Sequence, residues 1–298
     1  MPTVPVPVVV AASTTQTARA WVPSTVATAL ACASLFGFAL TGGPACQKGD
    51  RGGETGTQGA ASAPPSAGAS TASSAAAIGS ALAAGPGKLG TGRIKGTVHY
   101  SGKPDEPRPI TTPDPFCSQQ KLGNEDLLVS PAGGLANVLV HVSQGASGTY
   151  PPPATEAIVD QSGCMYRPRV QAVLAGQTVQ IRNSDQTLHN VHSYKGASTL
   201  FNQAQIPGTP PMTRTLSPGG QIIKFRCDVH PWMTGYVGVL SNPFFAVTGP
   251  DGSFSIDKLP SGTYTLEAWH ERTGVKSSTP IVVADGQTAT ASFDFGAP

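Results

Sequence analysis

The sequence has few charged residues. Only 12% of its 298 residues are Asp, Glu, Lys or Arg, and the formal net charge of +2 is spread without a basic stripe or an acidic run. Nucleic acids and membrane surfaces attract proteins through clustered charge. We therefore expect neither nucleic acid nor a membrane surface as an electrostatic partner. Any specific binding should depend on a local site and not on the overall charge.

Sustained helical patterns are also missing. Gly and Pro number 35 and 28 residues, and no stretch keeps apolar residues at helical spacing. From Gly92 onward, short apolar runs alternate with turns rich in Gly, Pro, Asn and Asp. The predicted strands lie in "RIKGTVHY", "LANVLVHVSQ", "VQAVLAGQTVQIRNSD", "GGQIIKFRC", "GYVGVL", "FFAVTGPDGSFSI", "GTYTLEAWH" and "STPIVVADGQTATASFDF". This pattern predicts an all-β protein built as two sandwiches.

In residues 1–45, Arg19 is the sole charged residue, and an apolar stretch runs from about Val26 to Leu40. The segment is predicted to be an export signal, and its apolar run is too short to span a bilayer comfortably. Cys46 follows directly and is a candidate for lipidation. The usual Leu three residues earlier is absent, so cleavage to a soluble periplasmic form is the alternative. The expected location is the periplasm or cell envelope, with membrane contact only through this N-terminal anchor.

Residues 46–91 are predicted to be a low-complexity linker. After Cys46 they are dominated by Gly, Ala, Ser and Thr, and they contain no aromatic residue. Such a segment has almost nothing to bury. Its r.m.s. span is roughly 35–40 Å, enough to hold a folded domain away from a membrane.

The five cysteines have different expected roles. Cys32 lies in the signal segment and Cys46 at its end. Cys117 and Cys164 lie in polar contexts without a histidine close in sequence, and an oxidising compartment favours a disulfide between them. That leaves Cys227 unpaired, and metal ligation is one explanation for an unpaired thiol in an exported protein.

The segment "CDVHPWM" brings Cys227, His230 and Met233 into seven positions between two predicted strands. Two imidazoles, one thiolate and a weak axial thioether describe a blue-copper centre. His189, 38 residues before Cys227 in "TLHNVH", is the candidate for the second imidazole. His192 competes for this role, but a step of three along an extended chain turns it to the opposite face.

Each of these side chains alone would more often be ordinary packing, since buried Cys and Met commonly fill gaps in cores. Their joint spacing favours a metal site. Zinc also accepts Cys and His, but Met233 is a poor zinc ligand and favours copper. His99, His141 and His270 stand singly in predicted strands and are expected to have no metal role. No open coordination position, general base or nucleophile is evident, so we expect no enzymatic activity.

The pair of motifs "TLHNVH" and "CDVHPWMTGYVGV" resembles the copper site of cupredoxins, and the short C-x2-H-x2-M spacing is similar to that of amicyanin. The resemblance covers about residues 155–241 and implies a Greek-key cupredoxin domain at 151–242. It implies copper ligation by His189, Cys227, His230 and Met233, and a role for Asn190 in tying the two ligand loops together.

The same resemblance implies one-electron transfer with a redox partner protein. It further implies that His230 reaches the surface within an apolar patch where that partner docks. Met212, Pro231 and Trp232 would contribute to the patch, with a core position as the alternative for Trp232. A copper carrier or buffer, and a structural envelope module without a redox role, are the alternative functions.

The flanking segments "GRIKGTVHYSGKP" and "TGPDGSFSIDKLPSGTYTLEAW" resemble a carboxypeptidase-regulatory or transthyretin-like sandwich. The resemblance implies that residues 92–150 and 243–298 form one such sandwich with the cupredoxin domain inserted between them. Two sandwiches in series are the competing layout. Tyr264 and Trp269 are expected to be core residues of this module.

Overall fold

The computed structural model describes residues 85–106, 108–216 and 220–297, and this part of the chain is all-β with one short 3₁₀ helix. The predicted signal segment, Cys46 and most of the predicted linker lie outside the described residues. Residues 85–91 of that linker range are hydrogen-bonded to the folded part, with Gly87 N–H donating to Thr149 O and Gly90 N–H to Lys258 O. No helix in the described part is long and apolar enough to cross a membrane.

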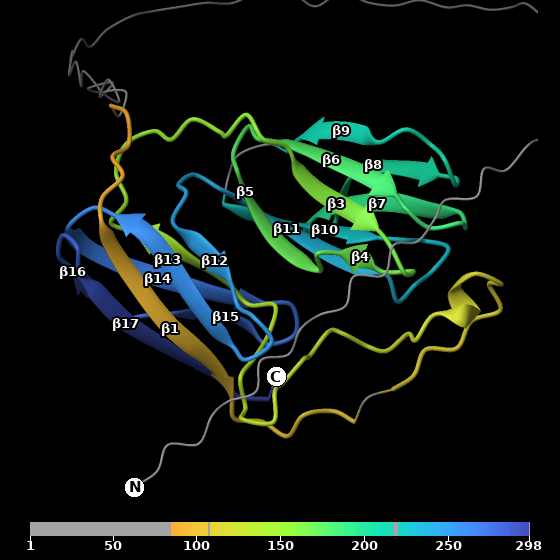
Figure 1. The fold of residues 1–298 in the computed structure, drawn as a ribbon, viewed down its shortest axis with the longest axis horizontal. Coiled ribbons are helices and arrows are strands. Elements are labelled where there is room, and N and C mark those ends of the chain that lie inside the picture. The colour runs from red at the N-terminus through yellow and green to blue at the C-terminus, as the bar shows by residue number, and fades with distance from the viewer. Residues whose placement is uncertain (1–84, 107, 217–219, 298) are drawn as a thin grey trace, which may run out of the picture. The chain divides into compact units, whose positions relative to one another are not determined.

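Two sheets form a first group around one apolar core (Figure 1). One sheet has the order β13-β1-β17, and the other has the order β12-β2-β14-β15, with β16 also pairing with β14. The strands are β1 (Gly92–Tyr100), β2 (Leu139–Gln144), β12 (Phe245–Val247), β13 (Ser253–Leu259), β14 (Gly262–His270), β15 (Gly274–Ser277), β16 (Ile281–Val283) and β17 (Thr288–Phe295). This group therefore combines strands from both ends of the described chain.

Alternation in the sequence explains how β1 packs. Ile94, Val98 and Tyr100 point into the core, whereas the charged and polar residues between them stay at the surface. Such alternation is typical of a strand with one buried face. Burying each large apolar side chain contributes about 1.5–3 kcal/mol. The predicted core residue Tyr264 is 2% exposed and belongs to the same core.

Two further sheets form a second group, with orders β5-β11-β10-β7-β8 and β4-β3-β6-β9. The strands are β3 (Ala157–Gln161), β4 (Tyr166–Arg167), β5 (Val170–Leu174), β6 (Thr178–Asn183), β7 (His189–Lys195), β8 (Ser198–Gln205), β9 (Met212–Thr215), β10 (Gln221–Arg226) and β11 (Thr234–Leu240). All of them come from the stretch of chain between β2 and β12, and a second apolar core lies between the two sheets.

A small third cluster, built around Leu139, Val170 and Leu240, joins the two groups. The expected core residue Trp269 is partly buried there and meets Tyr236 edge-to-face, with ring centroids 5.0 Å apart.

Beside this cluster, a buried ion pair links the groups: both nitrogens of one edge of the Arg169 guanidinium donate to the Glu271 carboxylate, at 2.5 and 2.8 Å. The two side chains are 5% and 6% exposed.

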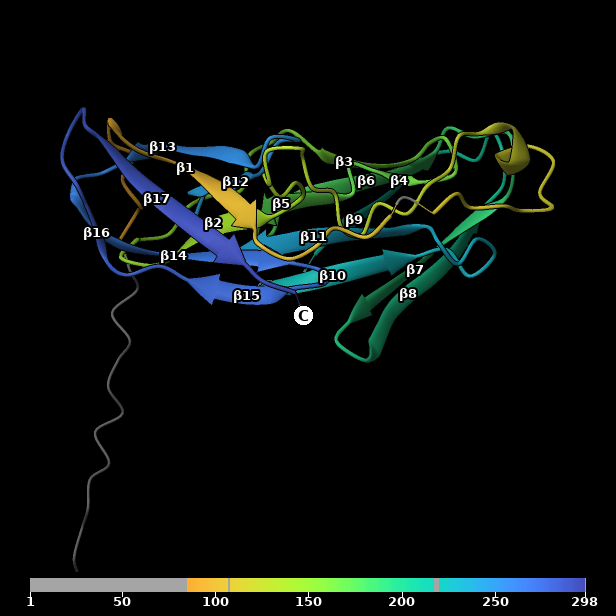
Figure 2. The same cartoon turned by 90° about the horizontal axis from the view of Figure 1, so that it is seen from below.

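The segment between β1 and β2 leaves the first group and packs on the second. It carries the 3₁₀ helix η1 (Cys117–Gln119), which Figure 2 shows beside the strands of the second group. Cys117 and Leu122 of this segment belong to the second core, and Ile110 and Phe116 pack against it, partly buried. Residues assigned by sequence to the first sandwich thus help to build the second.

Candidate metal centre

Three of the four predicted ligands lie on the connection between β10 and β11. These strands pair antiparallel up to Arg226 opposite Thr234, so residues 227–233 form a closed loop. Cys227 N–H donates to Met233 O at 3.2 Å, and Met233 N–H donates to His230 O at 2.9 Å. Pro231 restricts the backbone of His230 before it. The loop therefore holds its side chains in a fixed arrangement at the end of the two strands.

The fourth predicted ligand, His189, reaches the same place from β7. This strand pairs antiparallel with β10, with His192 opposite Arg226, so the start of β7 lies beside the end of β10. His189 is the first residue of β7 and is fully buried. The imidazole consequently has a rigid strand behind it.

The structure brings His189, Cys227 and His230 together. One ligand atom from each lies within 4.8 Å of the others, and all three residues are buried. The two Nδ1 atoms of His189 and His230 are 2.9 Å apart, and Cys227 Sγ is 3.7 Å from His230 Nδ1. Met233 closes the loop and is also fully buried.

Asn190 connects the two segments that carry these residues. Its Oδ1 accepts from Asp228 N–H at 2.6 Å, and its Nδ2 donates to Asp228 Oδ2 and to Asn202 Oδ1. Its backbone N–H donates to Cys227 Sγ at 3.4 Å. A single residue thus holds the ligand loop against β7 and also donates to the sulfur.

The surroundings of Cys227 favour the thiolate. Burial opposes its ionisation, but the neighbouring His189 imidazole and the backbone N–H of Asn190 outweigh burial, and the pKa of the thiol lies below its usual value. A thiolate is the form that binds a soft metal. The sulfur is therefore prepared to act as a ligand.

Asp185 faces the other side of His189. Its Oδ2 lies 2.9 Å from His189 Nε2, and the two side chains are 4% and 0% exposed. Burial opposes ionisation of this carboxyl, but hydrogen bonds from His189 and from two backbone N–H groups keep its pKa below the usual value. A carboxylate only accepts hydrogen bonds, so Nε2 of His189 carries the proton and Nδ1 presents a lone pair.

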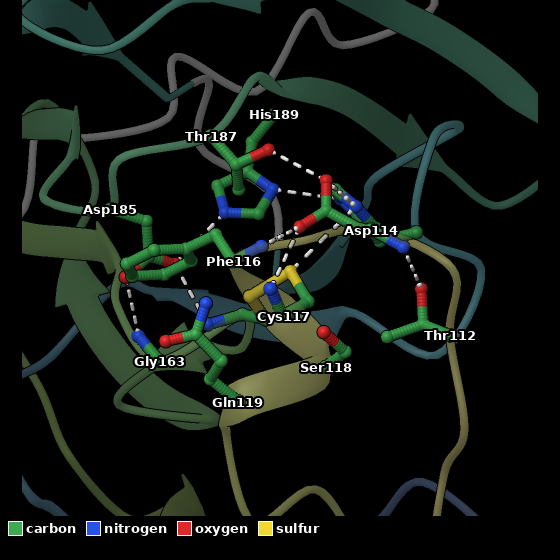
Figure 3. Close-up of a disulfide and its surroundings, with 12 residues drawn as sticks. Thr112, Asp114, Phe116, Cys117, Ser118, Gln119, Gly163, Asp185, Thr187 and His189 are labelled. Carbon is green, nitrogen blue, oxygen red and sulfur yellow. Dashed lines mark hydrogen bonds and ion pairs between the residues drawn. A yellow bond between two sulfur atoms is a disulfide. The ribbon is translucent and has the colours of Figure 1, made fainter.

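The outer edge of His230 is covered as well, by the segment before η1. Its Nε2 lies 3.5 Å from Asp114 Oδ2 and 3.7 Å from Cys117 Sγ. Cys117 is bonded to Cys164, which confirms the predicted disulfide. Figure 3 shows this disulfide with Asp114 on one side and with Asp185 and His189 nearby. Two cysteines without a histidine close in sequence are thus in contact with the histidine cluster.

This cover contradicts one expectation. His230 is 2% exposed, so it does not reach the surface within an apolar patch, because Asp114 and Cys117 occupy that position. Of the residues expected in the patch, Pro231 is exposed, while Met212 and Trp232 pack partly buried against the second core. Trp232 donates from Nε1 to Cys164 O at 3.0 Å.

The remaining histidines lie outside the cluster. His192 points away from it, with Nδ1 2.9 Å from Asp228 Oδ2 and Nε2 2.9 Å from Thr199 Oγ1. His99 is half exposed near Asp294, and His141 lies near Glu267. His270 is buried in the first group, and burial together with the positive charge of Arg169 lowers its pKa to about 4.

The donor set fits a copper ion. His189 Nε2 is hydrogen-bonded to Asp185, so the Nδ1 lone pair of His189 points toward His230 Nδ1 at 2.9 Å. A cation between these two nitrogens would be bound by both if His230 carried its proton on Nε2, the nitrogen nearest to Asp114. Two nitrogens each ~2.0 Å from one tetrahedral metal are roughly 3.3 Å apart, and a nitrogen and a sulfur are roughly 3.5 Å apart. The observed separations are close to these. Copper held by these residues would cycle between Cu(I) and Cu(II).

Sequence reasoning missed Asp114 and Asp185. Asp185 precedes His189 by four residues and Asp114 precedes Cys117 by three, spacings that carry no recognised signal. Both act through tertiary contacts. The predicted Cys117–Cys164 disulfide indicates which two segments lie side by side, but it does not indicate that they lie beside the histidines.

Comparisons with known proteins find cupredoxins among similar solved structures. A purple cupredoxin from Nitrosopumilus maritimus is 24% identical over 28% of this chain and 99% of its own, with a TM-score of 0.25. Amicyanin from Paracoccus versutus is 22% identical over 34% of this chain and 97% of its own, with a TM-score of 0.26. A Cu-containing nitrite reductase from Thermus scotoductus is 22% identical over 34% of this chain and 25% of its own, with a TM-score of 0.27.

No protein-family model matches the chain, and no curated protein matches it. The transthyretin-like resemblance of the first group has no counterpart among these findings. The likeness to solved structures is distant and partial, so the chemistry of the site rests on its own geometry.

Proposed function

We propose that this chain is an exported copper protein of cupredoxin type that transfers single electrons in the cell envelope. The observation that carries the proposal is the convergence of His189, Cys227 and His230 within 4.8 Å of one another in a buried site. Met233, on the same short loop, completes the ligand set as the weak axial donor.

The protein contributes rigidity. The ligands come from the first residue of β7 and from a loop closed by its own backbone hydrogen bonds, and Asn190 ties the two segments together. Ligands held in this way change position little between the two oxidation states of the ion. A small rearrangement favours rapid one-electron exchange over substrate chemistry.

Burial favours electron transfer over a carrier function. His189 and Cys227 are fully buried, and His230 lies beneath a segment fixed by a disulfide. A carrier must release its ion to an acceptor, which requires access for the acceptor's ligands. The covered site favours retention of copper, and the redox partner would dock on the surface around the exposed residues Val229 and Pro231 of the ligand loop.

The first group of sheets shows no comparable cluster among its described residues. We propose that it is a transthyretin-like scaffold into which the copper-binding sandwich is inserted, and that it carries no chemistry of its own. The export signal, the envelope location and the Cys46 anchor belong to the same proposal.

Metal reconstitution of the full chain tests the function. We expect purified protein offered equal copper and zinc to retain about one copper and to show an intense thiolate-to-copper absorption. Cys227→Ser and His189→Gln should lose the absorption, while the matched variant His99→Gln, changed at a half-exposed histidine, should keep it. A wild-type protein that stays colourless, or that retains only zinc, would refute the proposal.

A further inference from the structure

We propose that Asp185 and Asp114 are positioning residues of this centre. Asp185 holds the outward nitrogen of His189 by a hydrogen bond, Asp114 places its negative charge beside the outward nitrogen of His230, and the Cys117–Cys164 disulfide holds both carboxylates in place. This inference rests on the proposed copper function. Two side chains that are not among the four predicted ligands would then supply the negative charge beside the site.

Asp185 is built into its position. Its Oδ1 accepts from Gly163 N–H and its Oδ2 from Cys164 N–H, each at 2.7 Å, and Asp185 N–H donates to Asn183 Oδ1. The remaining contact of Oδ2 is His189 Nε2 at 2.9 Å. A buried carboxylate with its acceptor positions filled in this way holds the imidazole in one tautomer and one orientation.

Asp114 lies beside the other histidine and is itself held by hydrogen bonds. Its Oδ1 accepts from the N–H groups of Phe116 and Cys117 at 2.9 and 2.7 Å, and its Oδ2 accepts from Thr187 Oγ1 at 2.8 Å. His230 Nε2 lies 3.5 Å from Oδ2, farther than a hydrogen bond but within reach of the charge.

The disulfide connects the two systems. One of its cysteines donates its backbone N–H to Asp114 and the other donates to Asp185. Figure 3 shows Asp114 with Phe116 and Cys117 on one side of the disulfide, and Asp185 with Gly163 on the other. The crosslink thus fixes two backbone donors, each donor fixes a carboxylate, and each carboxylate faces one imidazole.

Charge gives this arrangement a measurable effect. A carboxylate on the outer nitrogen makes an imidazole a stronger donor, and negative charge near a metal stabilises its more highly charged state. Both aspartates therefore favour Cu(II) over Cu(I) and lower the reduction potential. The effect of Asp185 should exceed that of Asp114, because its contact is shorter and more deeply buried.

The test is the reduction potential of the copper-loaded full chain carrying Asp185→Asn or Asp114→Asn. We expect Asp185→Asn to weaken the preference for Cu(II) over Cu(I) about tenfold, which equals a rise of ~59 mV for one electron. Asp114→Asn should give a smaller rise. Asp285→Asn, at an exposed position in the turn between β16 and β17, removes the same charge and should leave the potential unchanged.

Asn at position 185 places an amide N–H group opposite the Cys164 N–H donor, so circular dichroism of this variant is the control for folding. Asp114→Asn avoids this conflict, because the Thr187 hydroxyl can accept a hydrogen bond instead of donating one. If either folded variant binds copper with a potential equal to that of Asp285→Asn, the inference is refuted. The proposed function would survive that result. A wild-type chain that binds no copper would instead refute the function itself.

Discussion

The disulfide offers a quantitative test of how the covering segment is held. Cys117 and Cys164 are 47 residues apart in sequence and both are fully buried. In the chain-entropy account, opening a loop of that length lowers the free energy of unfolding by about 4 kcal/mol at 25 °C. For a folded part of this size, that loss corresponds to a fall in Tm of about 8–16 °C.

The double variant Cys117→Ala/Cys164→Ala is the appropriate perturbation, since Ala avoids the cost of burying new hydroxyl groups. We expect the metal-free chain to lose about 4 kcal/mol in guanidinium unfolding followed by tryptophan fluorescence. Cys227→Ala is the matched control, because it removes a buried thiol and leaves the crosslink intact. A loss below ~1 kcal/mol for the double variant would refute the reasoning.

The same variant should also change the metal site. Cys117 Sγ lies 3.7 Å from His230 Nε2, and the Cys117 N–H helps to hold Asp114. Without the crosslink, this segment should open more often and expose His230. We expect copper to pass to an external chelator faster from the double variant than from the wild type. Equal release rates would show that the covering segment stays closed without the disulfide.

Two further predictions concern the first group of sheets and its junction with the second. Glu271→Ala leaves the buried Arg169 charge unpaired and should lower the free energy of unfolding, measured in urea, by about 3–5 kcal/mol. The control Asp257→Ala removes the partner of an exposed arginine and should lower it by about 1 kcal/mol or less. Burial lowers the pKa of His270 to about 4, so between pH 6.5 and 4 the unfolded chain binds a proton that the native chain does not. The free energy of unfolding should therefore fall by up to about 3 kcal/mol as the pH drops through that range. His270→Gln should flatten this part of the stability profile, and an unchanged slope would contradict the assignment.

Much of the fold could be predicted from local pattern. The alternation in β1 and β14 and the apolar runs of β10 and β11 predicted strands where the structure has them. β7 and β8 gave no such signal. β8 is exposed at nearly every position, and β7 buries polar residues such as His189 and Asn190 at the candidate site, so neither shows an apolar face.

The candidate site divides in the same way. Cys227, His230 and Met233 share one seven-residue loop, so their spacing in sequence carried the information. The cover over His230 could not be predicted, because it is made by a segment more than one hundred residues earlier that leaves its own group of sheets. Contacts of this kind depend on tertiary packing, and no local pattern encodes them.

The pairing of β1 with β17 has a consequence for the order of assembly. β1 lies parallel to β17 along its length, from Arg93 opposite Thr288 to Tyr100 opposite Phe295. Strands so distant in sequence come together slowly, because a long loop must close first. During synthesis, the nine strands from β3 to β11 can all associate before β17, the parallel partner of β1, has been made. The second group of sheets should therefore fold first, and the first group, whose strands lie on both sides of it in sequence, should complete its pairing last.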